Sequence, residues 1–462
     1  MTRPFRAHVL VCTQEKPDRT PCCASVRGKQ ILEAFQAEVG RAGLGGDVLV
    51  TSCGCLGLCE RGPNVVVYPQ GRWYTHVEPG EVAGIVRQHL SAGEPVDRGE
   101  EPDAETLRAE ITAHRTKVQR LMAARAAAGT MPEDLESMIR GFQPSRVLLT
   151  AIELDIFTAV AEVRAPAGVA AEDVAPRTGG SRRGVEALLN ALVALGLLEK
   201  KDGRFRNGPA ADTFLRAGAL HDSRAALTHT AHMWDRWGTL TECVRKGTPV
   251  AHLDMADRGQ DWFEPFIAAM HRNASLRAPI VAAALDLAGV GRLLDLGGGS
   301  GAYAAAFARA KPDLLATVFD LPAVTPLTRR YLDASGVGDR VRTVDGDLRT
   351  DAYGTGFDLV LVSAICHMNG PDENVAMFRQ ARAALNPGGR IVIHDYVLDD
   401  DKAGPRAGAL FALNMLVGTQ NGSAYSAAEY CSWLSQAGFE SARMVALPGP
   451  TDLVLAARPA GA

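Results

Sequence analysis

The stretch Arg292–Tyr303, with the sequence RLLDLGGGSGAY, decides the fold of the C-terminal half of this 462-residue chain. A short apolar run that contains an acid leads into a glycine-rich turn, and alanine-rich helical sequence follows. This order predicts a β-strand, a tight loop and the start of a helix, which together open a nucleotide-binding α/β unit. Glycines let the backbone approach a ligand closely, and the free amides at a helix start bind its polar groups.

Three later strands extend this unit. Thr317–Asp320 ends in an acid nineteen residues after Gly301, a spacing at which a carboxylate commonly binds a ribose hydroxyl pair. Val341–Val344 leads into Asp345–Asp347, and Phe357–Val362 is a fourth apolar run. Strands that alternate with helical sequence in this way predict a parallel sheet of the doubly wound type.

The order of these motifs resembles that of class I S-adenosylmethionine-dependent methyltransferases. The resemblance implies S-adenosylmethionine as cofactor. It implies that the glycines line the methionine portion of the cofactor, that Asp320 binds the ribose, and that Asp347 lies beside the adenine. The full set of implied cofactor-binding residues is Asp295, Gly297, Gly299, Gly301, Asp320, Leu321, Gly346, Asp347 and Ser363.

A histidine follows the fourth strand, in Ser363–His367, and Pro371–Glu373 comes after it. This pattern resembles the catalytic-histidine motif of the plant-type and hydroxyindole-type O-methyltransferases. The resemblance makes His367 the general base and Asp395 the acid that orients it, because an acid partner fixes the imidazole tautomer and stabilises its protonated form. A phenol has a pKa of about 10, so a base assists its reaction at neutral pH.

O-methylation of an aromatic small molecule is therefore the predicted reaction. The alternatives are C-methylation, and decarboxylation or hydroxylation on the same fold. Two positions depart from the family pattern: Met368-Asn369 stands where Asp-Trp is common, and Ala424 stands where many plant members have a second acid. The resemblance assigns the acceptor site to Met233, Trp234, Met270 and Asn414; for the first three, packing inside the protein is the alternative.

Residues 141–250 read as a winged helix. An apolar helix over 146–161 is followed by two shorter helices and by a hairpin with an Asp202-Gly203 turn,. The arrangement resembles the dimerisation domain of the same O-methyltransferases and implies a homodimer. Residues 177–206 carry seven Lys/Arg against three acids, so the alternative from a different class is a redox-sensing, DNA-binding regulator. We favour the dimer.

Cysteines crowd the N-terminus. Six of the nine lie in the first 59 residues: Cys12, Cys22, Cys23, Cys53, Cys55 and Cys59. In a reducing compartment such crowding indicates a metal site or redox chemistry rather than disulfides. Thiolates on loops between strands suit zinc or an iron–sulfur cluster. The spacing of Cys55 and Cys59 is longer than the C-x-x-C pair of a usual zinc ribbon.

The segments HVLVC, CLGLC, GPNVVVYPQGRWYTHV and HLSAGEPVDR, all within residues 7–98, resemble the thioredoxin-like 2Fe-2S ferredoxins. The resemblance implies a 2Fe-2S cluster with the ligands Cys12, Cys23, Cys55 and Cys59. A loop shift of one residue would put Cys22 in place of Cys23, Cys53 has no counterpart, and zinc is the alternative to the cluster. For the cluster we favour redox control, or electron delivery involving a redox partner, over a purely structural role.

The fold class is thus α/β, in four parts. These are a thioredoxin-like ferredoxin domain (1–98), a helical linker (99–140), a mostly α winged-helix dimerisation domain (141–250) and a Rossmann-like methyltransferase domain (251–462). The net charge of −4 gives no reason to expect nucleic acid as a partner,. No apolar run is as long as a membrane span, and the N-terminus lacks a signal-peptide core. We therefore expect a cytoplasmic enzyme without a membrane partner.

Overall fold

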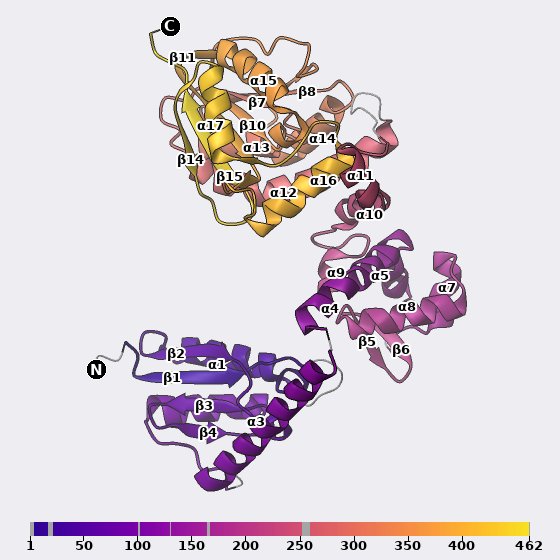
Figure 1. Ribbon diagram of the computed structural model, residues 1–462, viewed down its shortest axis with the longest axis vertical. Coiled ribbons are helices and arrows are strands. Elements are labelled where there is room, and N and C mark those ends of the chain that lie inside the picture. Colours follow the sequence, from indigo (N-terminus) through magenta and orange to yellow (C-terminus); the bar gives the residue numbers. More distant parts are fainter. Residues whose placement is uncertain are drawn as a thin grey trace. The chain divides into compact units, whose positions relative to one another are not determined.

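The computed structural model describes residues 4–16, 22–99, 102–129, 131–163, 167–251 and 259–461 (Figure 1). The chain divides into two compact units, Met1–Ile139 and Arg140–Ala462. The segment predicted as a linker, residues 99–140, falls almost entirely within the first unit. In the described ranges, no helix is long and apolar enough to cross a membrane.

A four-stranded sheet forms the centre of the first unit, in the order β2-β1-β3-β4. Strand β2 is parallel to β1, whereas β3 is antiparallel to both β1 and β4. The strands are β1 (Ala7–Cys12), β2 (Val48–Cys53), β3 (Val65–Tyr68) and β4 (Arg72–Tyr74), and the helices are α1 (Gly28–Arg41), α2 (Val82–Ile85), which continues as a π-helical turn (Val86–Ser91), α3 (Ala104–Ala127) and α4 (Glu133–Arg140). Parallel β1 and β2 therefore end at the same edge of this sheet.

Buried side chains of β1, α1 and β3 make up the core of this unit. Val9, Phe35 and Val67 are all inaccessible to solvent. Strand β4 ends at Tyr74. His76 adopts a φ angle of 53°, which is incompatible with an extended strand and turns the chain away from the sheet.

The second unit begins with a helical part that carries a small hairpin. Its elements are α5 (Phe142–Glu153), α6 (Ile156–Glu162), α7 (Ala171–Thr178), α8 (Arg182–Ala194), β5 (Leu198–Lys201), β6 (Arg204–Asn207), α9 (Pro209–Phe214), α10 (Arg224–Gly238) and α11 (Leu240–Lys246). The hairpin turns at Asp202 and Gly203, which have φ angles of 50° and 76°. Positive φ at both residues is typical of the tight turn that the Asp-Gly pair predicts.

One long helix predicted over residues 146–161 is in fact two. The chain breaks between α5 and α6 at Asp155, which has a φ angle of 49°. Its carboxylate accepts a hydrogen bond from the hydroxyl of Thr158 at 2.6 Å and forms an ion pair with Arg224 at 3.3 Å. The apolar pattern alone concealed this break, because the side chains on both sides of it enter the same core.

A seven-stranded sheet follows, in the order β14-β15-β11-β10-β7-β8-β9. Strands β7 to β11 are parallel, and β15 and β14 add antiparallel strands at one edge. The elements are α12 (Gln260–Ala283), β7 (Arg292–Leu296), α13 (Ala302–Ala310), β8 (Leu315–Asp320), α14 (Thr325–Ser335), β9 (Val341–Asp345), β10 (Phe357–Ser363), α15 (Pro371–Ala384), β11 (Leu385–Asp395), β12 (Val397–Leu398), α16 (Arg406–Gly418), β13 (Tyr425–Ser426), α17 (Ala427–Gln436), β14 (Glu440–Val445) and β15 (Asp452–Ala457).

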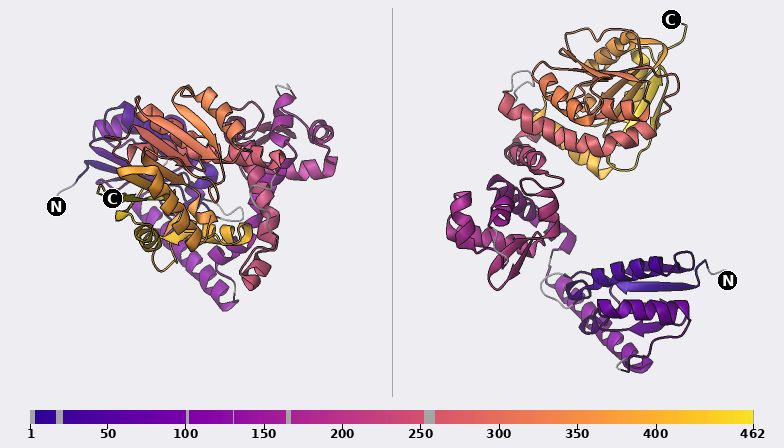
Figure 2. Two further views of the ribbon diagram at one scale, coloured as in Figure 1. Left: turned by 90° about the horizontal axis from the view of Figure 1, so that it is seen from above. Right: turned by 180° about the vertical axis from the view of Figure 1, so that it is seen from behind.

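Helices cover both faces of this sheet (Figure 1, Figure 2). On one face Leu294 packs in a core with Phe378 of α15, and on the other Leu293 packs with Phe307 of α13. Strand β7 lies between β8 and β10, so the chain order reverses direction there. In open α/β sheets ligands bind at the carboxyl ends of the strands at such a point.

Candidate functional site

The glycine-rich loop joins β7 to α13 at the carboxyl edge of the sheet. Gly297, Gly299 and Gly301 have φ angles of 61°, 55° and 73°, in the left-handed region that glycine enters at low cost. A Cβ atom added at Gly297 would lie 2.4 Å from Cδ1 of Ile365, in the segment that follows β10. The loop is therefore tightly folded and close to the end of β10.

Asp320 ends β8 beside this loop. Its Oδ2 accepts a hydrogen bond from the backbone N–H of Gly299 at 2.7 Å, and its Oδ1 accepts one from the N–H of Leu321 at 2.7 Å. A carboxylate can accept further hydrogen bonds at the same oxygens, so it can still bind a ribose diol. Burial raises the pKa of Asp320 to about 6, although the two amides oppose the shift.

Asp295 lies on β7, directly beneath the loop. Its side chain is fully buried, and neither carboxylate oxygen has a hydrogen-bond partner within 3.5 Å in the part of the chain described. Burial raises the pKa of Asp295 to about 7; the nearby Asp320 adds to the shift and the backbone N–H of Ala304 opposes it. A buried carboxylate without a partner is unfavourable, and a polar ligand at the loop would offset that cost.

Gly346 and Asp347, both predicted to bind the cofactor and Asp347 to lie beside its adenine, differ in what they contact. The N–H of Gly346 donates to the backbone oxygen of Asp320 at 2.9 Å, which joins the ends of β8 and β9. The Asp347 carboxylate accepts a hydrogen bond from Arg349 at 2.9 Å, and this bond lowers the pKa of Asp347. Both lie at the carboxyl edge, and an adenine contact stays a prediction.

Ser363, at the end of β10, is tied to the sheet. Its Oγ lies 2.9 Å from Nδ1 of His394 on β11, and Nε2 of His394 lies 2.8 Å from the hydroxyl of Thr451. Burial lowers the pKa of His394 to about 4, so this imidazole is neutral. Ser363 therefore serves the packing between β10 and β11 in this structure, and its predicted contact with the cofactor stays a prediction.

His367 and Asp395 form a buried pair at the same edge of the sheet. The Nδ1 atom of His367 lies 2.7 Å from Oδ1 of Asp395, and the backbone N–H of His367 donates to Oδ2 at 3.2 Å. Asp395 ends β11, and His367 lies in the turn after β10, so parallel neighbouring strands bring them together. Because the carboxylate holds Nδ1–H, the lone pair of the neutral imidazole is on Nε2.

Two aromatic rings flank this pair. The Phe411 ring, on α16, meets the His367 ring edge-to-face at 4.8 Å between centroids, and Tyr396 stacks on Phe411 at 4.1 Å. The backbone N–H of Tyr396 also donates to Oδ1 of Asp395 at 2.9 Å. The imidazole is therefore held by contacts from two sides, which suits a residue that must keep one orientation.

Among the predicted acceptor residues, Asn414 has a defined partner. The indole N–H of Trp237, on α10, donates to Oδ1 of Asn414 on α16 at 3.1 Å. Trp234 instead lies against the guanidinium of Arg146 on α5, at 5.4 Å from its ring centre. Trp237 is thus a neighbour of the candidate acceptor site that sequence reasoning missed.

The remaining predicted acceptor residues are less closely defined. Met233 on α10 and Met270 on α12 are both half-buried. Helix α12 does pass the glycine loop: Nδ1 of His271 lies 2.9 Å from the hydroxyl of Ser300, and Ile267 lies near Gly299. Met270 therefore lies on a helix that contacts the cofactor loop, and acceptor contacts of both methionines stay predictions.

The positions that depart from the family pattern lie in a closely packed part of the structure. Ala424 is buried, beside the short strand β13. Asn369 accepts at its backbone oxygen a hydrogen bond from Tyr425 at 2.6 Å. A Cβ atom added at Gly422 would lie 2.3 Å from the backbone oxygen of His367. The segment before β13 thus packs closely on the His367 turn.

The N-terminal cysteines gather at one edge of the smaller sheet. Cys12 ends β1, and the Sγ atoms of Cys55 and Cys59, in the loop after β2, lie 3.4 Å apart. A hydrogen bond between the thiols of Cys12 and Cys23 lowers the pKa of Cys12 and raises that of Cys23. The backbone N–H of Leu56 also bonds to the sulfur of Cys12, so the loop closes on the Cys12–Cys23 pair.

The two cysteines before α1 have different surroundings. Asn64 donates to the sulfur of Cys23 at 3.3 Å. Cys22 is also buried, but its sulfur faces Ser25 and Lys16 instead. Cys53 ends β2, as the neighbour of Cys12 in the sheet. Cys23 is thus the one that contacts Cys12, and its role as a ligand stays a prediction.

The meeting of the glycine loop, Asp320 and His367 at one switch point of a doubly wound sheet is the arrangement of S-adenosylmethionine-dependent methyltransferases. Residues 245–440 match the model of the O-methyltransferase domain, and residues 136–217 match that of the O-methyltransferase dimerisation domain. The predicted winged-helix dimerisation domain falls largely in the second range. The N-terminal cysteines precede both.

Solved and curated relatives agree. The 3-hydroxy-5-methyl-1-naphthoate 3-O-methyltransferase of Streptomyces sahachiroi is 36% identical over 349 residues, 72% of this chain and 99% of the relative. The tetracenomycin polyketide synthesis 8-O-methyltransferase of Streptomyces glaucescens is 35% identical over 336 residues, 71% and 97% of the two chains. Human N-acetylserotonin methyltransferase, solved with S-adenosylmethionine, has a TM-score of 0.63 at 27% identity, over 70% and 96%. This chain belongs to the O-methyltransferase family, and it is an S-adenosylmethionine-dependent methyltransferase.

Proposed function

We propose that this enzyme methylates a hydroxyl group on an aromatic small molecule and that it works as a homodimer. The observation that carries the proposal is the buried pair of His367 and Asp395, joined at 2.7 Å beside the glycine loop. One Streptomyces relative is named for a hydroxylated naphthoate, and the other for 8-O-methyl transfer in tetracenomycin polyketide synthesis. The dimerisation-domain match at residues 136–217 supports the dimer.

His367 acts as the general base. Its Nδ1–H donates to Asp395, which leaves Nε2 to accept the proton of the acceptor hydroxyl as the oxygen becomes nucleophilic. The imidazolium that forms is stabilised by the Asp395 carboxylate at 2.7 Å,. Phe411 against the ring keeps the imidazole in this orientation, so Nε2 stays directed at one place.

The cofactor would be held by the loop and the acids around it. When bound, S-adenosylmethionine supplies an electrophilic methyl group on its sulfonium. The glycine loop admits its methionine portion, and Asp320 would accept hydrogen bonds from the ribose hydroxyls. Asp295, fully buried beneath the loop, belongs to the same proposal. The roles of Leu321, Gly346, Asp347 and Ser363 belong to the same proposal.

The acceptor would bind against α16 and α12. The ring of Phe411 offers an aromatic edge, Asn414 an amide fixed by Trp237, and Met270 an adaptable thioether,. We propose Met233, Met270 and Asn414 as contacts of the acceptor. For Trp234 the contact with the Arg146 guanidinium supports the packing alternative, between α5 and α10.

A panel of naphthols tests this function. The enzyme is incubated with S-adenosylmethionine and 3-hydroxy-1-naphthoate, 1-naphthol or, as the matched control, 1-naphthoate without a hydroxyl. We expect a gain of one methyl group on an oxygen for the hydroxylated compounds only, located by mass spectrometry and NMR. Methylation at a ring carbon would contradict O-transfer, and sedimentation as a monomer would contradict the dimer.

We also propose that Cys12, Cys23, Cys55 and Cys59 bind a 2Fe-2S cluster in a thioredoxin-like domain. The sheet order β2-β1-β3-β4 supports the fold. Cys55 contacts Cys59, Cys12 bonds to Cys23, and the amide of Leu56 in the loop after β2 bonds to Cys12; these two pairs of thiols beside one loop support a ligand set of four cysteines. The cluster would serve redox control or electron delivery.

Metal analysis tests this second proposal. The full-length protein is purified without oxygen, and iron, sulfide and zinc are assayed together with the visible spectrum before and after dithionite. We expect about two iron and two sulfide per chain, as this cluster type requires. Protein with one zinc and no iron would overturn the cluster. Equal methylation rates with the cluster oxidised and reduced would contradict redox control and favour electron delivery.

A further inference from the structure

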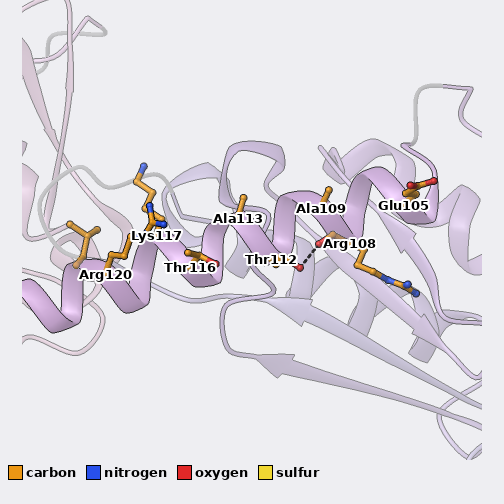
Figure 3. Close-up of a pocket in the computed structure, with 9 residues that line it drawn as sticks. Glu105, Arg108, Ala109, Thr112, Ala113, Thr116, Lys117 and Arg120 are labelled. Carbon is orange, nitrogen blue, oxygen red and sulfur yellow. Dashed lines mark hydrogen bonds between the residues drawn. The ribbon is translucent and has the colours of Figure 1, made fainter.

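Helix α3 has two different faces. One face packs on the cysteine loop and carries the buried Leu107 together with Ile111 and His114. The other face opens on a hollow of about 780 Å³. Figure 3 shows the side chains that line it, which all belong to this helix. They are Glu105, Arg108, Ala109, Thr112, Ala113, Thr116, Lys117, Arg120 and Leu121. None of the residues around this hollow is a candidate catalytic group, whereas the packed face places His114 beside Cys55.

Two contacts fix α3 on the loop. Arg61, two residues after Cys59, donates from Nε and Nη2 to the two carboxylate oxygens of Glu110, each at 2.8 Å. Such a two-pronged pair sets the direction as well as the distance between its partners. Gly57 has a φ angle of 87°, and an added Cβ would lie 3.3 Å from Cγ2 of Ile111. The absence of a side chain at Gly57 thus permits the close approach of the helix.

The third contact reaches the sulfur itself. Nε2 of His114 lies 3.8 Å from Sγ of Cys55, and the sulfurs of Cys55 and Cys59 with this nitrogen all lie within 4.8 Å of one another. The loop supplies its own donor, because the N–H of Gly57 bonds to Cys55 at 3.4 Å. Lys16 bonds to Cys59 at 2.9 Å. His114, by contrast, lies outside the domain predicted as residues 1–98.

We propose that His114 donates its Nε2–H to the Cys55 thiolate, raises the reduction potential of the cluster and docks α3 in a way that depends on the redox state. This inference rests on the proposed 2Fe-2S cluster. Hydrogen bonds to cluster sulfurs favour the more negative, reduced state. Reduction adds negative charge next to the imidazole, so it strengthens the same bond. By linkage, if docking of α3 favours reduction of the cluster, reduction of the cluster stabilises the docked helix by the same free energy.

The consequence concerns how a cluster could influence the rest of the chain. Helix α3 is the segment through which the sequence leaves the cysteine domain toward Arg140, where the second unit begins. If α3 docks more firmly on a reduced cluster, reduction raises the local stability of this helix. His114 is thus a positioning and tuning residue in this proposal, with the four cysteines as the ligands.

Three variants of the full-length protein test it. His114→Leu removes the donor and keeps a good helix former. His114→Gln restores an amide N–H at the end of a side chain of similar reach. Gln119→Leu, at an exposed position of the same helix, is the control. Iron and sulfide are measured first in each, and the potential is then determined by a redox titration followed by electron paramagnetic resonance.

We expect full iron and sulfide in every variant. The potential should be lower in His114→Leu, largely restored in His114→Gln, and unchanged in Gln119→Leu. Hydrogen exchange at 104–127 should be faster in the oxidised than in the reduced protein, and this difference should vanish in His114→Leu. Absence of iron from the unaltered protein would reject the cluster itself. Iron with the same potential in all variants would reject the role of His114, and loss of iron in His114→Leu alone would make His114 a ligand instead.

Discussion

The imidazole of His367 is joined to the carboxylate of Asp395 through Nδ1 at 2.7 Å, and its backbone N–H is joined to the other oxygen of the same carboxylate. One aspartate thus fixes both the side chain and the main chain of the residue that we propose as the base. A carboxylate that holds two groups of one residue restricts it more than a single bond would.

Replacing Asp395 should therefore impair chemistry and leave cofactor binding intact. Asp395→Asn keeps the size of the side chain but can donate to Nδ1, which favours the tautomer with the proton on Nε2. We expect kcat to fall roughly 10²- to 10⁴-fold, the range in which comparable pairs lose activity. Steady-state kinetics and calorimetry with S-adenosylmethionine check this. Asp400→Asn, at an exposed position of the following loop, is the control, and a kcat like that of the unaltered enzyme in Asp395→Asn would remove the pair from the mechanism.

Alanine at Gly297 should weaken the cofactor site. The position has a φ angle of 61° and would bring a Cβ to 2.4 Å from Ile365, whereas Gly289, with a φ angle of 73°, has nothing within 4 Å. Gly289→Ala should destabilise the fold by about 1–2 kcal/mol, because left-handed backbone costs that much for alanine, and Gly297→Ala should destabilise it more, because its Cβ also overlaps Ile365. Only Gly297→Ala should reduce affinity for S-adenosylmethionine. Denaturant titration and calorimetry separate the two effects; equal loss of affinity in both variants would show that strain alone is responsible.

Cofactor affinity should depend on pH through Asp320. Burial raises its pKa to about 6 in the unliganded protein, so below that pH the group is protonated and accepts ribose hydroxyls poorly. Affinity should be constant above about pH 7 and fall by up to roughly tenfold per pH unit below about pH 6. Calorimetry between pH 5 and 8 measures it. Asp320→Asn should bind weakly at every pH, and an unaltered pH profile in that variant would assign the titration elsewhere.

The raised pKa of Asp320 has the opposite effect on the stability of the fold, which should decrease as the pH rises. The pKa of Asp320 is higher in the folded chain than its ordinary value of 3.8, and that of Asp295 is raised to about 7. The folded state therefore binds protons more tightly, so the stability from these groups is present at low pH and is lost as the pH rises through about 4 to 7. In the absence of the cofactor, Asp295→Asn should raise the thermal stability of the second unit at pH 7.5, and it should raise it much less at pH 5. Thermal unfolding of the two proteins at both values tests this.

The parts of the fold that sequence predicts best are those set by local pattern. The glycine loop, Asp320 and the hairpin at Asp202 follow from residue types that the backbone conformation demands. The pairing of His367 with Asp395 was implied by the resemblance to the O-methyltransferase motif, and in the structure Asp395 ends β11 while His367 follows the neighbouring strand β10. The break at Asp155 escaped prediction, since apolar residues continue across it and the stop comes from a left-handed residue held by Arg224.

Contacts between residues that are distant in sequence could not be predicted. His114 and Cys55 are separated by 59 residues, and Trp237 and Asn414 by 177. An exposed histidine or an indole N–H on a helix has no distinctive spacing. Which of two nearby tryptophans turns toward α16 depends on the rotation of α10, and helical periodicity leaves that rotation undetermined when apolar residues lie on several sides.

That choice between tryptophans gives the last prediction. Trp237→Phe keeps an aromatic ring but removes the N–H that holds Oδ1 of Asn414 at 3.1 Å. The freed amide can rotate, so we expect KM for the naphthol acceptor to rise several-fold, corresponding to about 1 kcal/mol for one lost hydrogen bond. Affinity for S-adenosylmethionine should stay the same. Trp234→Phe is the matched control, because its ring lies against Arg146: its KM should stay within about twofold, and its cost should appear in thermal stability. If Trp234→Phe raised KM and Trp237→Phe did not, the acceptor would bind on the other side of α10.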